Sequence, residues 1–363
     1  MKRVLVAPLD WGLGHATRCV PVIRELQAQC CEVLVAGSGD SLRLLRKEFP
    51  ALLHFELPGY NPRYPLRGSM VMAMAAQLPR FVRVIVSEQR AVEKIVSIHQ
   101  IDLVISDNRY GCWSRFVPSV FITHQSNILM PKRFGFLGAL VRKSSEYLIN
   151  RFHLCWIPDF PEGNSLAGAL ISFGKMRLRT EVRYIGWLSR FVKRQKESVV
   201  KYDVLAVMSG PEPQRSELER QLLPQLRSSK LRFRLVRGLP SAESTDDDAV
   251  VNFLTSGEMQ DHMECSALIL ARSGYSTVMD LLALGKKAIF IPTPGQTEQE
   301  YLADKLKRSG VAYAMPQGEF DLAFALAESK NYAGFNGPEK NILLAEAVRE
   351  LTAFKLPRTA RNR

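Results

Sequence analysis

Short apolar runs alternate with amphipathic segments along the first 157 residues of the chain. Each apolar run has the length of a buried strand, and the segments between them place apolar residues at helical spacing, as at Val20, Ile23 and Leu26. Strands that alternate with helices predict a parallel sheet with helices on both faces. Strands are expected at 2–7, 31–36, 52–57, 101–106, 119–122 and 153–157, and helices at 16–29, 40–48 and 135–151. Residues 69–98 are expected to form either one long helix or two helices with a break at Pro79.

The alternation weakens and then resumes, which predicts two domains. Residues 158–174 are rich in Pro and Gly, and 190–201 are polar and charged, so we place the boundary between 185 and 200. The second series has strands expected at 203–208, 231–236, 249–254, 267–271 and 288–291, a helix at 214–227 and further helices opened by Ser276 and after Gly295. The predicted fold class is α/β. Two Rossmann-like, doubly wound parallel sheets, in domains 1–188 and 200–335, face each other across a cleft.

The excess positive charge of the chain lies in its first domain. The net charge is +13, and residues 1–200 carry 28 Lys and Arg against 15 Asp and Glu, whereas the rest carries 21 of each. Such a surface attracts an anionic partner such as a membrane surface, a phosphorylated lipid, an acidic glycan or nucleic acid, or it serves solubility alone. The basic amphipathic segment 132–151 leaves the same choice between a membrane contact and a helix that faces the core.

Neither a membrane span nor a secretory signal is visible. No apolar run reaches 18 residues, and the N-terminus leads directly into a strand. The six cysteines lack the spacing of a metal site. We therefore expect a cytoplasmic protein with reduced thiols, either free or bound peripherally to the inner face of the membrane.

Two glycines and a histidine follow the first strand. Gly12 and Gly14 allow a tight turn against a ligand, and His15 stands in the first turn of the next helix. The helix dipole lowers the pKa of His15 and favours a neutral imidazole, which can accept a proton from a hydroxyl. A histidine that only caps or packs the helix is the alternative. A third glycine is missing, which argues against a dinucleotide site.

Polar residues also follow the fourth and fifth strands. Asp107 can hydrogen-bond one ring nitrogen of His15 if its strand lies beside the first, or else it simply begins a turn. His124 and Asn127 stand on the same rim, either as contacts for an acceptor or as parts of a polar loop.

Three strand-to-helix junctions of the second domain predict a nucleotide-sugar site. The pairs Ser209-Gly210 and Ser273-Gly274 expose backbone N–H groups, which suit a phosphate at a helix N-terminus. The first turn of a later helix carries groups that suit sugar hydroxyls, namely Glu298, Gln299 and Glu300. All these groups follow strands of one parallel sheet, so we expect them at one edge.

The second domain has two further acidic features, a single aspartate in a helix and a run of three aspartates before a strand. Asp280 lies in the helix that Ser276 opens, where its carboxylate can reach ribose hydroxyls or remain on the helix surface. The run Asp246-Asp247-Asp248 contains the D-x-D pattern of metal-dependent sugar transferases, but it precedes a strand instead of following one and indicates a solvated turn. We therefore expect no metal and no cofactor, since a nucleotide sugar would be a substrate.

Together these motifs resemble the GT-B glycosyltransferase superfamily. They are most similar to the group of the bacterial peptidoglycan GlcNAc transferase, which has a C-terminal domain of the family 28 type, and to relatives whose N-terminal motif reads GLGHATR. Residues 250–306 follow that group's donor-binding region, including R-S-G-x-x-T, an acid, A-x-G and an acid beside Gln. Two positions depart from it: Met208-Ser209-Gly210 stands where the group has Gly-Gly-Ser, and Gly295 where many members have His. The donor sugar therefore stays open.

The resemblance implies roles for these residues. His15 would be the base and Asp107 its partner, Leu254 would contact the nucleotide base, Asp280 the ribose, and residues 298–300 the sugar. The remaining donor-binding residues would be Gly12, Gly14, Ser209, Gly210, Arg272, Ser273, Gly274, Tyr275, Ser276 and Thr277. The resemblance also implies a last helix, 338–354, that crosses back to the first domain, and a place in the synthesis of a cell-envelope polysaccharide.

The expected function is an inverting, metal-independent glycosyltransferase. Its partners would be a nucleotide-sugar donor, a UDP-sugar by the habit of the family, and a glycan or lipid-linked acceptor. A nucleotide-sugar hydrolase of the same fold is one alternative, because Gly12–Cys19 fits its G-x-G-H-x-x-R-C motif, although the bulk at 60–100 and 125–180 favours an acceptor site. A non-catalytic nucleotide-sugar-binding protein is another. Nucleic acid is disfavoured because the basic half lacks interleaved aromatic residues.

Overall fold

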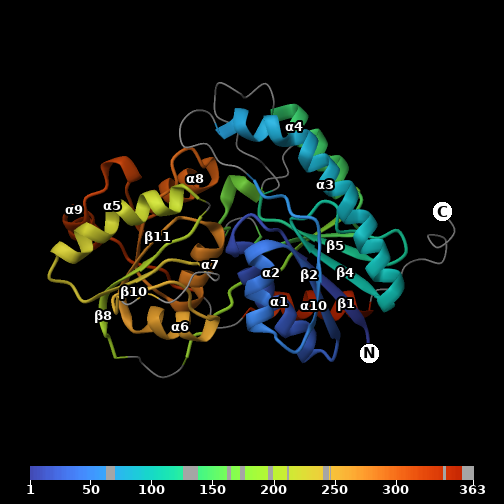
Figure 1. Cartoon of the computed structure of the whole chain (residues 1–363), viewed down its shortest axis with the longest axis horizontal. Helices are drawn as coiled ribbons and strands as arrows, with labels where there is room; N and C mark the ends of the chain where they lie inside the picture. The colour runs from blue at the N-terminus through green and yellow to red at the C-terminus, as the bar shows by residue number, and fades with distance from the viewer. Residues whose placement is uncertain are drawn as a thin grey trace.

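Two α/β domains lie side by side in the computed structural model of the chain (Figure 1). The structure describes residues 1–62, 70–125, 138–161, 165–171, 176–194, 199–210, 212–239, 245, 247–337 and 341–353. Asn127, Asp246, residues 132–137 of the basic segment, and residues 338–340 and 354 of the predicted last helix lie outside this part of the chain.

The N-terminal domain is built on a parallel sheet with the strand order β3-β2-β1-β4-β5-β6-β7. Its strands are β1 (Arg3–Pro8), β2 (Glu32–Gly37), β3 (Leu53–Glu56), β4 (Leu103–Asp107), β5 (Ser119–Ile122), β6 (Leu154–Ile157) and β7 (Glu181–Tyr184). Its helices are α1 (Leu13–Ala28), α2 (Gly39–Glu48), α3 (Met70–His99), α4 (Gly138–Ile149) and the 3₁₀ turn η2 (Gly168–Ile171). The central strand is buried on both faces, since Val4, Leu5 and Val6 are all fully covered.

The C-terminal domain repeats this architecture with the order β10-β9-β8-β11-β12-β13, again all parallel. Its strands are β8 (Tyr202–Val207), β9 (Phe233–Val236), β10 (Val250–Val251), β11 (Ser266–Ala271), β12 (Ala288–Phe290) and β13 (Tyr313–Ala314). Its helices are α5 (Gln214–Ser228), α6 (Ser256–Glu264), α7 (Tyr275–Leu284), α8 (Thr297–Arg308), η3 (Gln317–Glu319), α9 (Leu322–Ser329) and α10 (Ile342–Ala353).

The predicted fold class is confirmed, because both domains are parallel doubly wound sheets. The choice between one long helix and two at 69–98 is decided, and one predicted strand differs. Helix α3 runs through Pro79 without a break, since Phe81, Val92 and Val96 bury one continuous face and offset the lost hydrogen bond. The strand expected at 249–254 ends at Val251, because Thr255 and Glu258 form a capping box that starts α6 at Ser256.

In each sheet the order in which the chain adds strands reverses at the centre. The position of that reversal determines where a ligand can bind. In the first sheet the chain leaves β1 toward β2 and later returns on the other side as β4, and in the second sheet β8, β9 and β11 do the same. Parallel strands all end at one edge, so the crevice between β1 and β4 and that between β8 and β11 are the natural ligand sites of this fold.

The last helix of the chain packs on the first domain. Figure 1 shows α10 beside α1 and below the first sheet. Gln29 in the turn after α1 donates to the carbonyl of Ala345 over 2.9 Å, and Asn341 donates to the carbonyls of Ile185 and Trp187. The second domain is therefore tied to the first both by the linker and by this returning helix.

The hydropathy of the helices bears on the membrane question. Over the described ranges, none of the helices combines the length and the apolar character that crossing a bilayer requires.

Candidate active site

The loop between β1 and α1 is held in a fixed shape at the centre of the first sheet. Leu9 donates its backbone N–H to the carbonyl of Asp107 over 2.9 Å, and the Ser41 hydroxyl donates to the carbonyls of Leu9 and Gly12. Gly12 is the N-cap of α1 and has φ +90°, a conformation that favours glycine. No side chain caps this helix start, so its first backbone N–H groups remain available to a ligand.

His15 and Asp107 are in direct contact. The register of the sheet pairs Pro8 at the end of β1 with Asp107 at the end of β4, which brings the carboxylate next to the first turn of α1. His15 Nδ1 lies 2.7 Å from Asp107 Oδ1. The Nδ1–H group donates to the carboxylate, and Nε2 is then the ring nitrogen that carries the free lone pair. This is the geometry of a general base held by an orienting acid.

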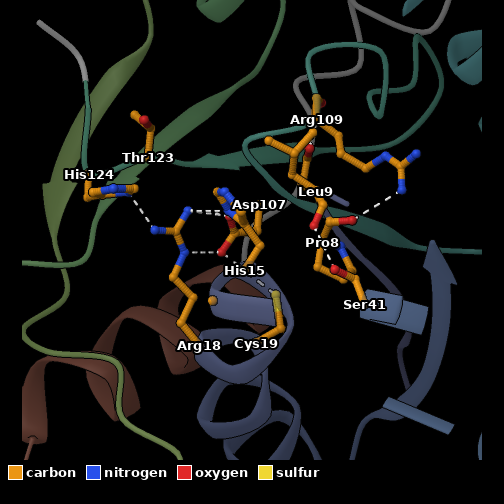
Figure 2. Close-up of polar contacts among 12 residues, drawn as sticks. Pro8, Leu9, His15, Arg18, Cys19, Ser41, Asp107, Arg109, Thr123 and His124 are labelled. Atoms are coloured by element: carbon orange, nitrogen blue, oxygen red, sulfur yellow. Dashed lines mark hydrogen bonds and ion pairs between the residues drawn. The ribbon is translucent and has the colours of Figure 1, made fainter. Parts of the chain in front are cut away.

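Arg18 completes this cluster and was not among the residues expected at the site. Its Nε and Nη2 atoms donate to the two carboxylate oxygens of Asp107, and its Nη1 atom donates to His124 Nδ1. Figure 2 shows the guanidinium lying between Asp107 and His124. Its spacing of three residues from His15 puts both side chains on one face of α1, and this was the signal that could have identified it.

The charges of the cluster favour a neutral His15 imidazole next to an ionised Asp107 carboxylate. Burial lowers the pKa of His15, and the nearby Arg18 lowers it further, against the opposing effect of Asp107. Burial alone would raise the pKa of Asp107, but Arg18 and His15 outweigh it and hold that pKa at about 2. At neutral pH the pair is therefore an unprotonated histidine beside an anionic aspartate, which is the state a base requires.

His124 bridges the two domains. Its ring stacks on Tyr275 of α7, with centroids 4.8 Å apart and planes only 3° from parallel. Because Arg18 donates to Nδ1, the proton of the ring is on Nε2, and that group donates to Glu298 Oε1 of α8 over 3.0 Å. The rim of the first sheet is thus joined to the helix that was predicted to read the donor sugar.

The N-termini of α1 and α7 approach each other close to this contact between the two domains. Gly274 is the N-cap of α7, and no side chain caps that helix either. A methyl group added to Gly14 would lie 2.4 Å from the Ser276 hydroxyl, so any larger residue at this position would force the Ser276 side chain to move. Two uncapped helix N-termini, with Thr277 also in the first turn of α7, create a region of positive potential that suits a phosphate group.

Several predicted donor-binding side chains are engaged within the protein. The Ser273 hydroxyl donates to the carbonyl of Gln299, and the Gln299 side chain accepts from the N–H of Thr293. Glu300 accepts from the N–H of Gly295, which has φ +78°. These side chains shape the two junction loops. Of the three acidic and amide residues in this turn, Glu298 is the one joined to the first domain.

Three other predicted residues also have internal partners. The buried Arg272 guanidinium donates to the carbonyls of Ile291, Pro292 and Gln214, and burial lowers its pKa to about 10. The Tyr275 hydroxyl donates to the carbonyl of Pro158. Leu254 is 7% exposed and belongs to the core. A contact of these three residues with a donor would therefore run through their backbone groups or through a rearrangement.

Asp280 faces the linker between the domains, in contrast to the ribose contact that the resemblance implies. Its carboxylate accepts from the Ser189 hydroxyl over 2.6 Å and lies 3.8 Å from the Arg190 guanidinium. Burial raises its pKa to about 6, despite Arg190 and Ser189. Ribose binding by Asp280 stays a prediction, and it would require the carboxylate to leave the linker.

The remaining predicted positions lie at the edges of the second sheet. Ser209 and Gly210 follow β8, and Gly210 has φ +103° with open space where a side chain would stand. Asp247 accepts from the N–H of Ala249 and pairs with Arg227, as expected of a turn. Across the described residues, no three His, Cys, Asp or Glu side chains are grouped as metal ligands.

Comparisons with known proteins agree on one class. Residues 210–333 match the model of the glycosyltransferase family 28 C-terminal domain. An uncharacterized glycosyltransferase of Methanosarcina acetivorans is 24% identical over 344 residues, which is 86% of each chain. The spinosyn rhamnosyltransferase SpnG, solved with thymidine diphosphate, superposes with a TM-score of 0.60 at 13% identity over 97% of this chain and 96% of that one. The chain is a glycosyltransferase with a GT-B fold.

A shorter stretch of the enzyme has a further similarity. The UDP-N-acetylglucosamine–N-acetylmuramyl-(pentapeptide) pyrophosphoryl-undecaprenol N-acetylglucosamine transferase of Methylobacterium nodulans is 35% identical to the enzyme over 89 residues, 24% of this chain and 23% of that protein. The family match contains both α7 and α8. The His15–Asp107 pair of this glycosyltransferase lies outside that match, in the N-terminal domain.

Proposed function

We propose that this glycosyltransferase moves a sugar from a nucleotide diphosphate donor to an acceptor hydroxyl, with inversion at the anomeric carbon and without a divalent metal. The observation that carries the proposal is the His15–Asp107 pair, at 2.7 Å, beside the two converging helix N-termini. The SpnG complex holds thymidine diphosphate, and the Methylobacterium relative uses a UDP-sugar. The higher sequence identity to the UDP-sugar enzyme, 35% against 13%, makes UDP the first nucleotide to test.

The reaction needs one base and one anion site. His15 Nε2 takes the proton of the acceptor hydroxyl while that oxygen attacks the anomeric carbon from the face opposite the diphosphate. The bond from the anomeric carbon to the diphosphate oxygen breaks, and the nucleotide diphosphate leaves with the bonding electrons. Asp107 stabilises the imidazolium that forms, and the backbone N–H groups at the start of α7 stabilise the leaving group.

A donor panel with two readouts tests this function. UDP-, TDP- and GDP-sugars are first screened by thermal shift, because a ligand that binds only the folded state raises the melting temperature. The best donor is then incubated with acceptors in the presence and absence of EDTA. We expect acceptor-dependent transfer that EDTA leaves unchanged. Rapid release of free sugar in a stoichiometric amount, without an acceptor, would instead indicate a nucleotide-sugar hydrolase. Donor binding without any turnover would indicate a non-catalytic binding protein. Loss of activity with EDTA would refute metal independence.

We also propose that the acceptor is carried on an anionic membrane, which α3 contacts. Three apolar residues spaced by four, Leu78, Val82 and Val86, are 57%, 57% and 46% exposed on this helix. Arg83 and Arg90 are exposed on the same helix. Apolar side chains flanked by basic ones are typical of a helix that lies on the surface of an anionic bilayer.

Vesicle binding tests the membrane contact. We expect the enzyme to co-sediment with vesicles that contain phosphatidylglycerol and only weakly with pure phosphatidylcholine. Val82→Asp should lower this binding about tenfold, since it adds a negative charge to the apolar stripe. Phe324→Asp is the matched control, because Phe324 is 52% exposed on the C-terminal domain, away from α3. Equal binding of both variants would refute the role of α3.

A further inference from the structure

One buried arginine contacts both the base-orienting acid and the link between the domains. The side chain of Arg18 is 2% exposed, and the Asp107 side chain is fully buried. Arg18 donates through Nε and Nη2 to the two oxygens of Asp107 and through Nη1 to His124. Its Nη2 atom also lies 2.9 Å from His15 Nδ1. The planar guanidinium thus has a polar neighbour on each of its three nitrogens.

These contacts restrict the Asp107 carboxylate to one orientation. Both of its oxygens are bound by the same rigid group, so rotation about the carboxylate bond would break two charge-assisted hydrogen bonds at once. Oδ1 is then left in the plane where it accepts from His15 Nδ1. A lysine at this position would supply the same charge but not the fork of donors.

The same guanidinium extends the network into the second domain. Arg18 donates to His124 Nδ1, His124 donates to Glu298 through Nε2, and the His124 ring stacks on Tyr275. The polar path therefore runs from His15 through Asp107, Arg18 and His124 to Glu298, and it crosses from α1 to α8. Each step is a hydrogen bond between groups that are buried or partly buried.

We propose that Arg18 is a positioning residue for sugar transfer, which holds Asp107 against His15 and at the same time ties the base to the donor-side Glu298 through His124. The inference rests on the proposed role of His15 as base. It adds that the geometry of this base depends on a residue that touches neither the donor nor the acceptor. Loss of Arg18 should therefore disturb the imidazole and the chemical step more than the affinity for the donor.

The charges around His15 predict in which direction its pKa changes when Arg18 is removed. The groups that face the imidazole are Arg18 from α1, Asp107 from β4, His124 from the loop after β5, and Glu298 from α8. The Cys19 thiol of α1 contacts Asp107 and not the imidazole. Burial and Arg18 lower the pKa of His15, whereas Asp107 raises it. Removing the cation takes away one lowering effect and leaves the charge of Asp107 uncompensated. Both changes raise the pKa of His15.

Proton NMR of the free enzyme tests this without any substrate. The chain has six histidines, so the ring signals can be assigned by single substitutions. We expect the titration midpoint of His15 to move to higher pH in Arg18→Gln, while that of His153, at the far end of the sheet, stays unchanged as the internal control. An unchanged midpoint of His15 would overturn the inference. This measurement remains informative even if the enzyme proves not to transfer sugar, so the two proposals can fail separately.

Kinetics of a conservative variant provide the second test. Arg18→Lys keeps a cation beside Asp107, so the fold retains its buried charge balance. Because a displacement of about 1 Å at a reacting group can cost about a hundredfold in rate, we expect kcat to fall by about 10- to 100-fold with little change in the KM for the donor. Arg234→Lys is the matched control, since Arg234 is a partly buried arginine of β9, in the other domain, that donates to the Tyr202 hydroxyl. Equal kcat values for the two lysine variants would contradict the positioning role.

Discussion

Replacing His15 with glutamine is expected to lower the rate of sugar transfer by about 10²- to 10⁴-fold, the usual contribution of a general base. Glutamine keeps a hydrogen-bonding group near Asp107 but cannot take a proton from the acceptor hydroxyl. Burial and Arg18 lower the pKa of His15, so the wild-type imidazole is already unprotonated at neutral pH. The rate should fall as the pH drops through that lowered pKa, because protonation removes the lone pair on Nε2.

The donor should still bind to this variant, and that separates catalysis from folding. The thermal shift caused by the nucleotide diphosphate is expected to match that of the wild-type enzyme, since the proposed anion site consists of backbone groups at the start of α7. His153→Gln is the control. Burial lowers the pKa of His153 as well, but the residue precedes β6 and so lies at the opposite edge of the sheet. Transfer by His15→Gln at the rate of His153→Gln would rule out His15 as the base.

Removal of Glu88 is expected to cost about 3–5 kcal/mol in the free energy of unfolding, because it leaves a buried guanidinium without its counter-ion. The side chains of Glu88 and Arg109 have no exposed surface and lie 2.5 Å apart. Tyr60 also donates to Glu88 over 2.7 Å, and Arg109 donates to the carbonyls of Pro8 and Pro58. The pair thus joins α3 to the loop that carries the start of α1. Urea denaturation of Glu88→Ala measures the loss.

An exposed pair in the same domain supplies the comparison. Arg46 and Glu56 lie 3.4 Å apart, and their side chains are 44% and 76% exposed. Water screens such a pair, so Glu56→Ala should change the free energy of unfolding by at most about 1 kcal/mol. If the two alanine variants unfold at the same urea concentration, the Glu88–Arg109 pair does not stabilise the fold in this way.

The amino-acid sequence alone determined the architecture and the strand ends at which the two residues of the proposed catalytic pair lie. Alternating apolar runs and helical segments specify parallel sheets, because strands buried on both faces are apolar throughout and need helices to connect them. Parallel strands end at one edge, so His15 after the first strand and Asp107 at the end of the fourth were expected to meet if those strands were neighbours. The register between Pro8 and Asp107 satisfies that condition.

Only the tertiary structure decided which partner each polar side chain takes. Arg18 pairs with Asp107, 89 residues away, and Asp280 is held by Ser189 across the domain boundary. His124 reaches Glu298, 174 residues away. The periodicity of a sequence specifies which face of an element is buried, and that information is local. The partner of a buried charge depends on what distant segments place within about 3 Å of it, and that distance is defined only after the two sheets, the linker and the helices have packed together.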